Sequence, residues 1–364
     1  MPLSNFKPAE YRAQLQQKVD RLKPAFAELG AATAEVFSSS ETHYRMRAEF
    51  RIQHIDDEPQ YVMFRKDGDR KAVVIDEFPV ACKPIAELMQ PLRRAIAQSD
   101  TLKRRLFQIE FLSGLSGEVL VSLIYHRPLD EDWEREARAL MEQFSIGIVG
   151  RSRKQRLVLA QPYITETLNA DGQAFTFRHY ENSFTQPNAG VNEQMISWAC
   201  KQLPKLSDDL LELYCGCGNF TLPLSRYFNK VLATEVSKTS TQAAKENCTL
   251  NDISNIEFAR LSAEEISQAL QGVRPFRRLA HLDLADYQLN TVFVDPPRAG
   301  LDDFSRTFVG QFKRILYISC NPETLLRDLE YLCQNHHIRS LAFFDQFPYT
   351  THMECGVFLE EKSV

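Results

Sequence analysis

A cysteine stands where a predicted buried strand ends. The apolar run "RILYIS" leads into Cys320, and Asn321 and Pro322 follow before a helical pattern begins. Inside such a run, a free cysteine would pack as a small hydrophobic residue. At the exit of a strand it lies where α/β proteins place their binding and reactive groups. A thiolate there can add to carbon 6 of a pyrimidine. Because an ordinary thiol has a pKa of about 8.5, we expect the site to lower it.

A glycine turn follows another predicted strand. Gly216 and Gly218 let the backbone turn tightly and approach a ligand closely, but Thr221 stands where a dinucleotide site would have a third glycine. Glu235, at the end of the next predicted strand, is suitably placed to bind the two hydroxyls of a ribose. This combination favours a nucleoside without a pyrophosphate, and S-adenosylmethionine is the obvious candidate.

Asp295 ends the fourth predicted strand of this region, within an Asp-Pro-Pro-Arg sequence that closes with Arg298. Two prolines hold the backbone extended, so the carboxylate projects where it could accept a hydrogen bond from a base or favour a sulfonium cation. Amino-group methyltransferases have an aromatic residue in place of Arg298, which disfavours an amine as the target. Because the carboxyl ends of parallel strands share one edge, we expect Gly216, Glu235, Asp295 and Cys320 to converge on one cleft.

Glu354 is the candidate proton acceptor. It directly precedes the last predicted strand, "CGVFLEE", and an antiparallel strand begins at the edge where its parallel neighbours end. The topology therefore predicts that Glu354 lies beside Cys320. There a carboxylate could remove the carbon-5 proton of a pyrimidine adduct and allow the thiol to leave. His352, close by, is a rival base.

The order of the elements predicts an α/β protein with two domains. Residues 1–180 combine a helix at 8–29, short β-type runs, and helices around 83–98 and 130–144, which predicts an α+β domain on a mostly antiparallel sheet. Residues 181–364 alternate five strands with helices, one of them at 220–228, which predicts a doubly wound, Rossmann-like parallel sheet. The last two apolar runs predict a terminal antiparallel hairpin at the edge of that sheet.

The composition is that of a globular cytoplasmic protein. Of the 364 residues, 44% are hydrophobic and 25% are charged, no apolar run is long enough to span a membrane, and the start lacks a signal-peptide core. The eight cysteines are scattered, which indicates a reduced compartment without a disulfide framework. Only Cys215 and Cys217 are close together, and they lack partners at metal-ligand spacing, so we expect no metal. No obligate protein partner is evident.

Several of these segments resemble the bacterial S-adenosylmethionine-dependent tRNA (uracil-5-)-methyltransferase family. They are "LELYCGCGNF", "VLATEVS", "FVDPPRAGL", "ILYISCNPETL" and "QFPYTTHMECGVFL", joined in the first half by "THYRMRAEFRI" and "ENSFTQPN". The resemblance implies methylation of carbon 5 of a T-loop uridine in tRNA, with Cys320 as nucleophile and Glu354 as proton acceptor. It further implies that S-adenosylmethionine is held by Gln186, Tyr214, Asn219, Glu235 and Asp295.

The resemblance also separates branches of the family. Related enzymes that act on ribosomal RNA usually carry an N-terminal cysteine cluster for an iron–sulfur centre, whereas Cys82 is the only cysteine before residue 200 here. The T arm of tRNA is therefore the expected partner, held by residues 1–180. Basic and aromatic residues supply the candidate RNA contacts, namely Arg47, Arg51, Phe107, Gln108, His126 and Arg298.

Other functions remain open at this point. A cytosine-5 methyltransferase uses the same thiolate addition, but its DNA-modifying members carry a Pro-Cys dipeptide near the fourth strand, where this chain has "DPPRAG". The same reaction could act on ribosomal RNA or tmRNA with a T-like loop. A non-catalytic RNA-binding or RNA-folding protein is the alternative from another class, and the intact Cys320, Glu354 and Asp295 argue against it.

Overall fold

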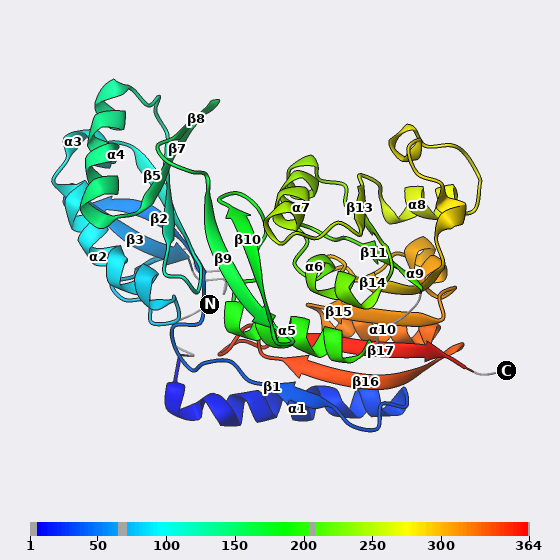
Figure 1. Cartoon of the computed structure of the whole chain (residues 1–364). Coiled ribbons are helices and arrows are strands. Elements are labelled where there is room, and N and C mark those ends of the chain that lie inside the picture. The colour runs from blue at the N-terminus through cyan, green and yellow to red at the C-terminus, as the bar shows by residue number, and fades with distance from the viewer. Residues whose placement is uncertain (1–5, 65–70, 204–207, 363–364) are drawn as a thin grey trace.

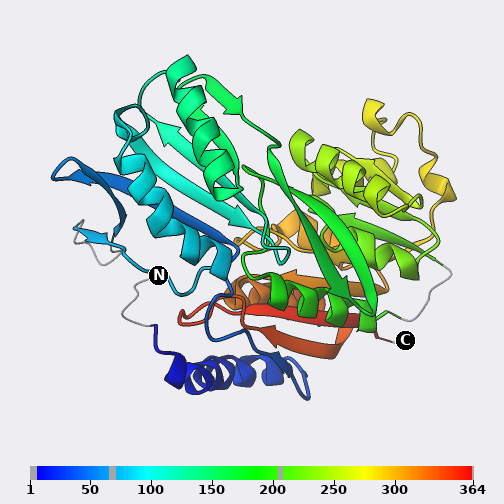
Figure 2. The same cartoon turned by 60° about the vertical axis from the view of Figure 1, so that its left-hand side comes forward.

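The structure is a computed structural model that describes residues 6–64, 71–203 and 208–362. Its strands form an eight-stranded sheet, a seven-stranded sheet and a two-stranded ribbon (Figure 1). The ribbon lies between the two larger sheets in the views of Figures 1 and 2.

The eight-stranded sheet contains the parallel strands predicted from the second half of the sequence. Its strand order is β1-β16-β17-β15-β14-β11-β12-β13. The five parallel strands are β11 (Asp209–Leu213), β12 (Val231–Thr234), β13 (Ile256–Ala259), β14 (Leu289–Val294) and β15 (Arg314–Ser319). All residues of β11 and β12 are buried, because helices cover both faces of the sheet. The predicted Rossmann-like α/β fold class is confirmed.

The helices of this half alternate with the strands as predicted. They are α5 (Ala189–Lys201), α6 (Thr221–Leu224), α7 (Lys238–Leu250), α8 (Ala263–Leu270), α9 (Asp303–Val309) and α10 (Pro322–Leu332). The helix expected at 220–228 is shorter than expected: a single turn, α6, continues as the 3-10 turn η3 (Ser225–Tyr227), after which Phe228 is extended. Helix α5 packs closely on β17 because Gly356 has no side chain. A Cβ there would lie 2.5 Å from the Trp198 ring.

The terminal hairpin is present, but it does not form the edge of the sheet. Strand β16 (His336–Phe344) pairs antiparallel with β17 (Glu354–Glu361), and β17 also pairs antiparallel with β15. The prediction of an edge position is wrong because β1 (Glu35–Phe37) pairs in parallel with the outer side of β16. A strand from the start of the chain thus covers backbone groups that the hairpin would otherwise expose.

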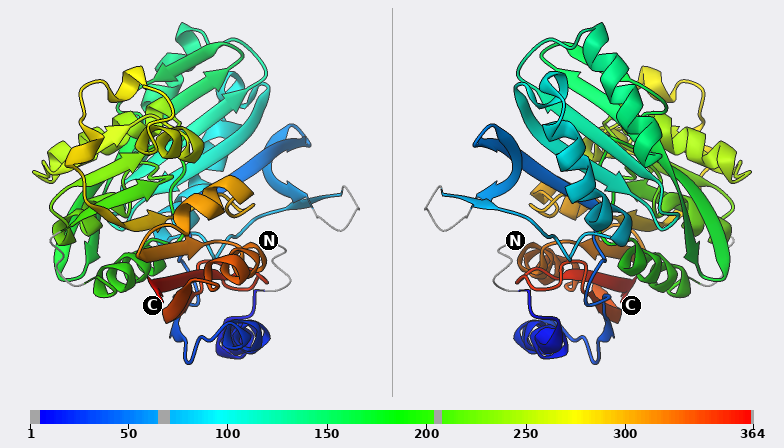
Figure 3. Two further views of the ribbon diagram at one scale, coloured as in Figure 1. Left: turned by 90° about the vertical axis from the view of Figure 1, so that its right-hand side faces the viewer. Right: turned by 90° about the vertical axis from the view of Figure 1, so that its left-hand side faces the viewer.

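The N-terminal helix also lies against this sheet. Helix α1 (Tyr11–Glu28) buries one face, on which apolar residues recur at spacings of three and four, and its Phe26 ring contacts the Phe343 ring at 5.5 Å between centroids. Figure 3 shows α1 nearly end-on beneath β16 and β17. Residues 11–37 therefore pack with the C-terminal half, although the proposed boundary at residue 180 remains a prediction.

The seven-stranded sheet is mostly antiparallel, as expected, with order β4-β3-β2-β5-β6-β7-β8 and one parallel pair, β6 with β7. Its strands are β2 (Arg47–Ile55), β3 (Glu58–Phe64), β4 (Ala72–Val74), β5 (Leu106–Ser113), β6 (Val119–Tyr125), β7 (Gly147–Ser152) and β8 (Gln155–Val158). Its helices are α2 (Lys83–Ala97), α3 (Asp100–Lys103) and α4 (Glu131–Phe144).

The two-stranded ribbon consists of β9 (Tyr163–Ala170) and β10 (Gln173–Tyr180), paired antiparallel in continuous register. Asp171 and Gly172 form its turn, and both have positive φ, 48° and 75°. An Asp-Gly pair with this backbone geometry is the preferred two-residue turn between antiparallel strands.

A buried lysine joins α1 to the segment that precedes Glu354. The Lys18 ammonium donates to Asp345 Oδ1 at 2.6 Å, to the Phe347 carbonyl at 2.9 Å and to the His352 carbonyl at 3.1 Å. The Lys18 side chain is 7% exposed and that of Asp345 is fully buried. We call the segment from Asp345 to Met353, which connects β16 to β17, the hairpin loop. Lys18 fixes both of its ends.

We predict that Lys18→Met destabilises the protein by about 3–5 kcal/mol, the usual cost of leaving one member of a buried ion pair without its partner. Urea unfolding of the free protein measures this loss. Lys23→Met is the matched control, because Lys23 is an exposed residue of the same helix, and its change should stay within about 0.5 kcal/mol. Equal midpoints for the two variants would show that the Lys18–Asp345 pair does not stabilise the fold.

Candidate active site

The sheet topology brings Cys320, Asp295 and Glu354 together. Cys320 directly follows β15, Asp295 directly follows β14, and Glu354 is the first residue of the antiparallel β17. Ser319 of β15 pairs with Cys355 of β17, so one step further along this register Cys320 lies opposite Glu354. Residues opposite each other in an antiparallel pair have their side chains on one face. The juxtaposition expected from the sequence is therefore present.

The two carboxyl groups hold their protons more strongly than ordinary acids. Glu354 is 4% exposed, and burial followed by the neighbouring Asp295 raises its pKa well above the usual value. Burial raises the pKa of Asp295 to about 7. Because a buried carboxylate loses its hydration, a carboxyl group in this position has a proton affinity suited to exchange near neutral pH.

The thiol of Cys320 is not activated in the free protein. The thiol pKa is raised to about 11, mainly by burial and then by the carboxyl groups of Glu354 and Asp295, whereas Arg298 lowers it only weakly. The expectation of a lowered pKa is therefore wrong for the protein alone. Burial and the two acidic neighbours raise the thiol pKa more than the Arg298 cation lowers it.

Local hydrogen bonds fix the turn that carries Cys320. The Asn321 side chain accepts from the Glu323 backbone N–H at 3.2 Å and caps α10, which begins with Pro322. The Asn321 side-chain amide also donates to the Arg298 carbonyl at 3.2 Å. The Arg298 guanidinium itself is exposed and lies 3.3 Å from His352 Nδ1. The loop after Asp295 is thereby tied to the Cys320 turn and to the end of the hairpin loop.

A pocket lies at the carboxyl ends of β11, β12 and β14, and residues predicted to bind the methyl donor line it. They are Gln186, Tyr214, Gly216, Asn219, Glu235 and Asp295. Glu235 Oε2 accepts from the Gly216 N–H at 3.1 Å and its Oε1 accepts from the Ser237 N–H at 2.7 Å. These bonds fix the carboxylate beside the glycine turn and leave further lone pairs for a ligand.

Further bonds fix the other side chains of this pocket. Asn219 and Asn192 exchange two amide hydrogen bonds of 2.8 and 2.9 Å. Gln186 accepts from the Gln346 amide at 3.3 Å, which links it to the hairpin loop. Tyr214 has a positive φ of 62°, a conformation that costs a non-glycine residue energy and turns the chain sharply after β11.

The pocket contains polar atoms that the protein does not satisfy. Glu212 Oε2 and Thr185 Oγ1 are buried without a hydrogen-bond partner among the described residues, and both residues line the pocket. Burial raises the pKa of Glu212 to about 8. Unpaired buried polar groups are costly unless a ligand or water completes them. The carboxyl, amide and hydroxyl groups that line the pocket fit a polar, positively charged nucleoside.

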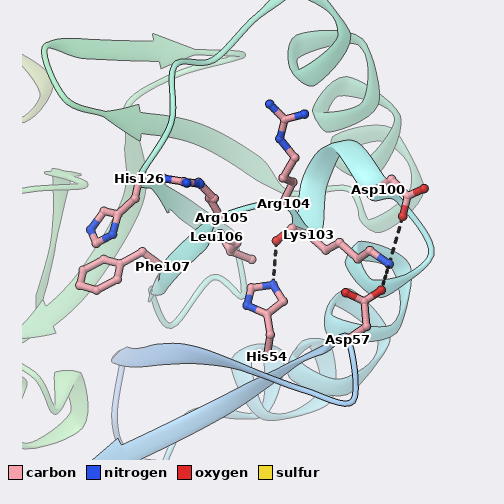
Figure 4. Close-up of a pocket in the computed structure, with 9 residues that line it drawn as sticks. All are labelled: His54, Asp57, Asp100, Lys103, Arg104, Arg105, Leu106, Phe107 and His126. Carbon is pink, nitrogen blue, oxygen red and sulfur yellow. Dashed lines mark hydrogen bonds and ion pairs between the residues drawn. The ribbon is translucent and has the colours of Figure 1, made fainter.

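Two of the predicted RNA contacts, Phe107 and His126, line a second pocket. Figure 4 shows Phe107 and His126 side by side, and their rings stack at 3.9 Å between centroids with an interplanar angle of 25°. The Arg51 guanidinium lies over the Phe107 ring, 3.9 Å from its centroid. The register of β5 and β6 shifts between Leu106 and Gln108, so Phe107 is a bulged residue whose ring leaves the regular alternation.

The other predicted RNA contacts point elsewhere. Arg47 donates to the Ser183 carbonyl at 2.8 Å and to the Glu181 carbonyl at 3.4 Å, which fixes the segment leading to Gln186. Gln108 donates to Glu110 at 2.5 Å. Lys103, which was not among the predicted contacts, lines the second pocket and is paired with Asp57 at 2.7 Å and with Asp100 at 3.0 Å, as the dashed lines in Figure 4 show.

The sequence analysis did not identify Lys18, Glu212 or His179, to which the structure gives specific positions. Lys18 appears as one charge among many on a helix, and nothing local indicates its distant partner. Glu212 does carry a signal, because it interrupts the apolar run "DLLELY". His179 lines the donor pocket from β10, a strand that the sequence analysis did not assign.

Neither a metal-binding cluster nor a membrane-spanning helix is found in the described part of the chain. Residues 6–64, 71–203 and 208–362 contain no group of three or more His, Cys, Asp or Glu side chains that could hold a metal ion. None of the helices in these ranges has the length and apolar character needed to cross a bilayer.

The glycine turn after β11, the acidic residue after β12 and the antiparallel β17 between β15 and β16 define a Rossmann-like methyltransferase fold. The sequence profile of the tRNA (uracil-5-)-methyltransferase family matches residues 10–362. The chain therefore belongs to this family, and the family and enzyme class predicted from the sequence are confirmed.

Relatives and solved structures agree with this assignment. The chain is 52% identical to a tRNA/tmRNA (uracil-C(5))-methyltransferase of Acinetobacter baylyi, over 96% of this chain and 98% of the relative. It is 49% identical to the protein of that name from Aromatoleum aromaticum, over 100% and 98%. A solved tRNA (uracil-54, C5)-methyltransferase of Pyrococcus abyssi, in complex with S-adenosyl-L-homocysteine, has the same fold with a TM-score of 0.73. It is 24% identical and covers 96% of this chain and 83% of its own.

The two glycines of the turn yield a matched prediction. Both have positive φ, 56° at Gly216 and 90° at Gly218, so alanine at either should cost about 1 kcal/mol in the free energy of unfolding. A Cβ at Gly216 meets no atom within 4 Å, whereas one at Gly218 lies 2.6 Å from the buried Leu222 side chain. We expect Gly218→Ala to cost about 1–3 kcal/mol more, by urea unfolding. Equal losses would contradict this packing argument.

Proposed function

We propose that this protein methylates carbon 5 of the T-loop uridine of tRNA, using S-adenosylmethionine. The observation that carries the proposal is the register of β15 and β17, which sets Cys320 opposite Glu354 beside a nucleoside-type pocket. The family and the names of the relatives support tRNA as the substrate. The names of the Acinetobacter baylyi and Aromatoleum aromaticum relatives also include tmRNA, which favours it as a second substrate.

In the proposed reaction, Cys320 and Glu354 act in sequence on the uracil ring. The Cys320 sulfur forms a bond to carbon 6 after losing its proton, and electron density moves to carbon 5. The sulfonium of S-adenosylmethionine would supply the methyl group: carbon 5 would bond to it, the sulfur–methyl bond would break, and S-adenosylhomocysteine would leave. Glu354 then takes the proton from carbon 5, the carbon 5–carbon 6 double bond re-forms, and the sulfur leaves. Its buried carboxyl group, with a raised pKa, is a stronger base than an exposed carboxylate.

The donor is proposed to bind at the glycine turn. Glu235 is proposed to accept hydrogen bonds from the ribose hydroxyls. The carboxyl groups of Asp295 and Glu212 both line the pocket, and a cationic donor would favour their ionised forms, which would in turn stabilise its charge. Gln186, Tyr214, Gly216, Gly218 and Asn219 complete the proposed set.

The Cys320 thiol must lose a proton that it holds tightly in the free protein. We infer that activation belongs to the assembled complex. A cationic donor in the pocket would counter the acidic neighbours that raise the thiol pKa. The thiol then stays protonated, and so less reactive, until its substrates are present.

The stack of Arg51, Phe107 and His126 is the proposed platform for an unpaired base of the T loop. RNA loops are commonly recognised through bases that leave the helix and stack on aromatic side chains. Arg298, exposed beside the Cys320 turn, is proposed to contact the RNA near the target. The hydrogen bonds of Arg47 and Gln108 within the protein favour a positioning role for both.

The covalent step predicts different outcomes for two variants. Cys320→Ala should abolish both methylation and the covalent protein–RNA adduct, because the attacking sulfur is gone. Glu354→Gln should slow turnover by roughly 10²–10⁴-fold and accumulate the adduct, because the proton on carbon 5 cannot be removed. Unmodified tRNA transcript, radiolabelled S-adenosylmethionine, nucleoside analysis and denaturing gels provide both readouts.

Glu361→Gln is the matched control, since Glu361 is exposed at the other end of β17. It should retain the wild-type rate and show no extra adduct. Normal turnover of Glu354→Gln would refute Glu354 as the proton acceptor. Absence of 5-methyluridine with the wild-type protein would refute the proposed reaction itself.

A second prediction concerns the RNA platform. Phe107→Ala should weaken tRNA binding by about 1–3 kcal/mol, the usual contribution of one stacked base, while single-turnover methylation at saturating RNA changes less. Filter binding at fixed salt measures the affinity. Phe64→Ala removes another exposed aromatic of the same sheet and should leave the affinity unchanged. Equal affinities for the Phe107 and Phe64 variants would place the platform elsewhere.

A further inference from the structure

The eight thiols of this chain differ in accessibility. All are free, five of them are buried, and Cys217, Cys320 and Cys333 are half-exposed. Burial is the main cause that raises the pKa of Cys320 to about 11, and it also raises the pKa of Cys333. We therefore expect both thiols to react slowly with electrophiles, because the thiolate is the nucleophilic form.

Cys217 lies in the same pocket as a buried histidine. His179, on β10, is 5% exposed and lines the donor pocket together with Cys217. His179 Nε2 lies 3.5 Å from Glu166 Oε2 on the neighbouring strand β9. Glu166 is itself held, since its Oε1 accepts from the Leu115 N–H at 2.7 Å. The second ring nitrogen of His179, Nδ1, is buried without a hydrogen-bond partner among the described residues.

Cys217 and His179 thus line one pocket, and Glu166 lies behind the histidine. Burial lowers the pKa of His179, but the neighbouring Cys217 thiol and Glu166 carboxylate raise it more, to about 9. A carboxylate that orients a histidine beside a thiol is the arrangement that cysteine nucleophiles use. The proposed methylation does not use Cys217, His179 or Glu166, so this cluster is unassigned.

We propose that Cys217, paired with His179 and Glu166, is a site of covalent modification by small soft electrophiles and peroxides, and that modification blocks the donor pocket. With a peroxide, His179 takes the thiol proton, sulfur bonds to one peroxide oxygen and the O–O bond breaks. The departing oxygen takes the proton, which leaves a sulfenic acid and water or an alcohol. With iodoacetamide, a sulfur–carbon bond forms and iodide leaves.

The backbone around Cys217 explains why modification of its sulfur would block the donor pocket. Cys217 lies between Gly216 and Gly218 in the turn, and its carbonyl accepts from the Asn247 amide at 3.0 Å. Because α7 holds this carbonyl, the residue cannot readily move away from the pocket that it lines. An added group on the sulfur must then share space with the ligand. This second part of the proposal rests on the proposed donor site, whereas the reactivity of the thiol does not.

The first test is iodoacetamide labelling of the full-length protein, with peptide mass analysis over time. We expect Cys217 to be labelled before Cys320 and Cys333, and S-adenosylhomocysteine to protect it. His179→Gln, which removes the proton acceptor, should slow labelling of Cys217 by roughly tenfold or more. Earlier labelling of Cys320 or Cys333, or wild-type labelling of Cys217 in the folded His179 variant, would overturn the proposal.

The second test measures S-adenosylhomocysteine binding by calorimetry before and after hydrogen peroxide, with dimedone to trap sulfenic acid. The wild type should lose binding as dimedone appears on Cys217, and Cys217→Ser should keep its own untreated affinity. Cys333→Ser, a matched control at a thiol outside the pocket, should remain as sensitive as the wild type. Dimedone on Cys217 with unchanged binding would overturn the blockage. No binding by untreated protein would refute the proposed donor site and leave the labelling result to stand alone.

Discussion

The antiparallel insertion of β17 between β15 and β16 is the constraint on which the candidate site depends. A sheet of parallel strands offers only carboxyl ends at its binding edge, and these carry Asp295 and Cys320. A reversed strand is the simplest way to bring the first residue of a strand to the same edge. Glu354 occupies that position, opposite Cys320 in register. The proposed nucleophile and the proposed base therefore lie at the end of one hydrogen-bonded ladder, whose geometry is more rigid than that of a loop.

The same closeness creates an electrostatic conflict. Two carboxyl groups beside a half-buried thiol raise its pKa, although the proposed reaction needs the thiolate. The conflict disappears if cationic charge enters with the donor, because each acidic group then stabilises the donor. Cys217 has a different environment, since it lines the donor pocket together with the buried His179. On our proposal, the thiol of the glycine turn is therefore the more reactive of the two.

Local patterns in the sequence identified the site, and distant contacts explain what they missed. Cys320, Asp295, Glu235 and the glycine turn could be found because each follows an apolar strand, and a parallel sheet gathers such ends. Glu354 required the additional argument that the last strand is reversed. The edge position of the hairpin was predicted wrongly because β1 is short and its partner strand begins at residue 336.

The directions of side chains were the other feature that the sequence did not predict. Arg47 and Arg51 lie on the same strand, yet Arg47 bonds to the segment before Gln186 while Arg51 stacks on Phe107. Nothing in their spacing distinguishes them. The ribbon of β9 and β10 did carry a local signal, the Asp171–Gly172 turn between alternating residues. His179 would have been placed on a strand had that turn been used.

The contact between Lys18 and Asp345 has a consequence for synthesis of the chain. Helix α1 leaves the ribosome early, but Asp345, the partner of its Lys18 ammonium, is made 327 residues later. The strands β16 and β17 that the helix covers also lie near the end of the chain. Its apolar face must stay unburied until nearly the whole protein exists, and sequence-distant contacts of this kind slow folding. A fragment that begins near residue 181 would keep Cys320 and Glu354 yet lack Lys18 and β1. Its Asp345 carboxylate would have no counter-ion, so the two halves of the sequence are not independent parts that can be exchanged.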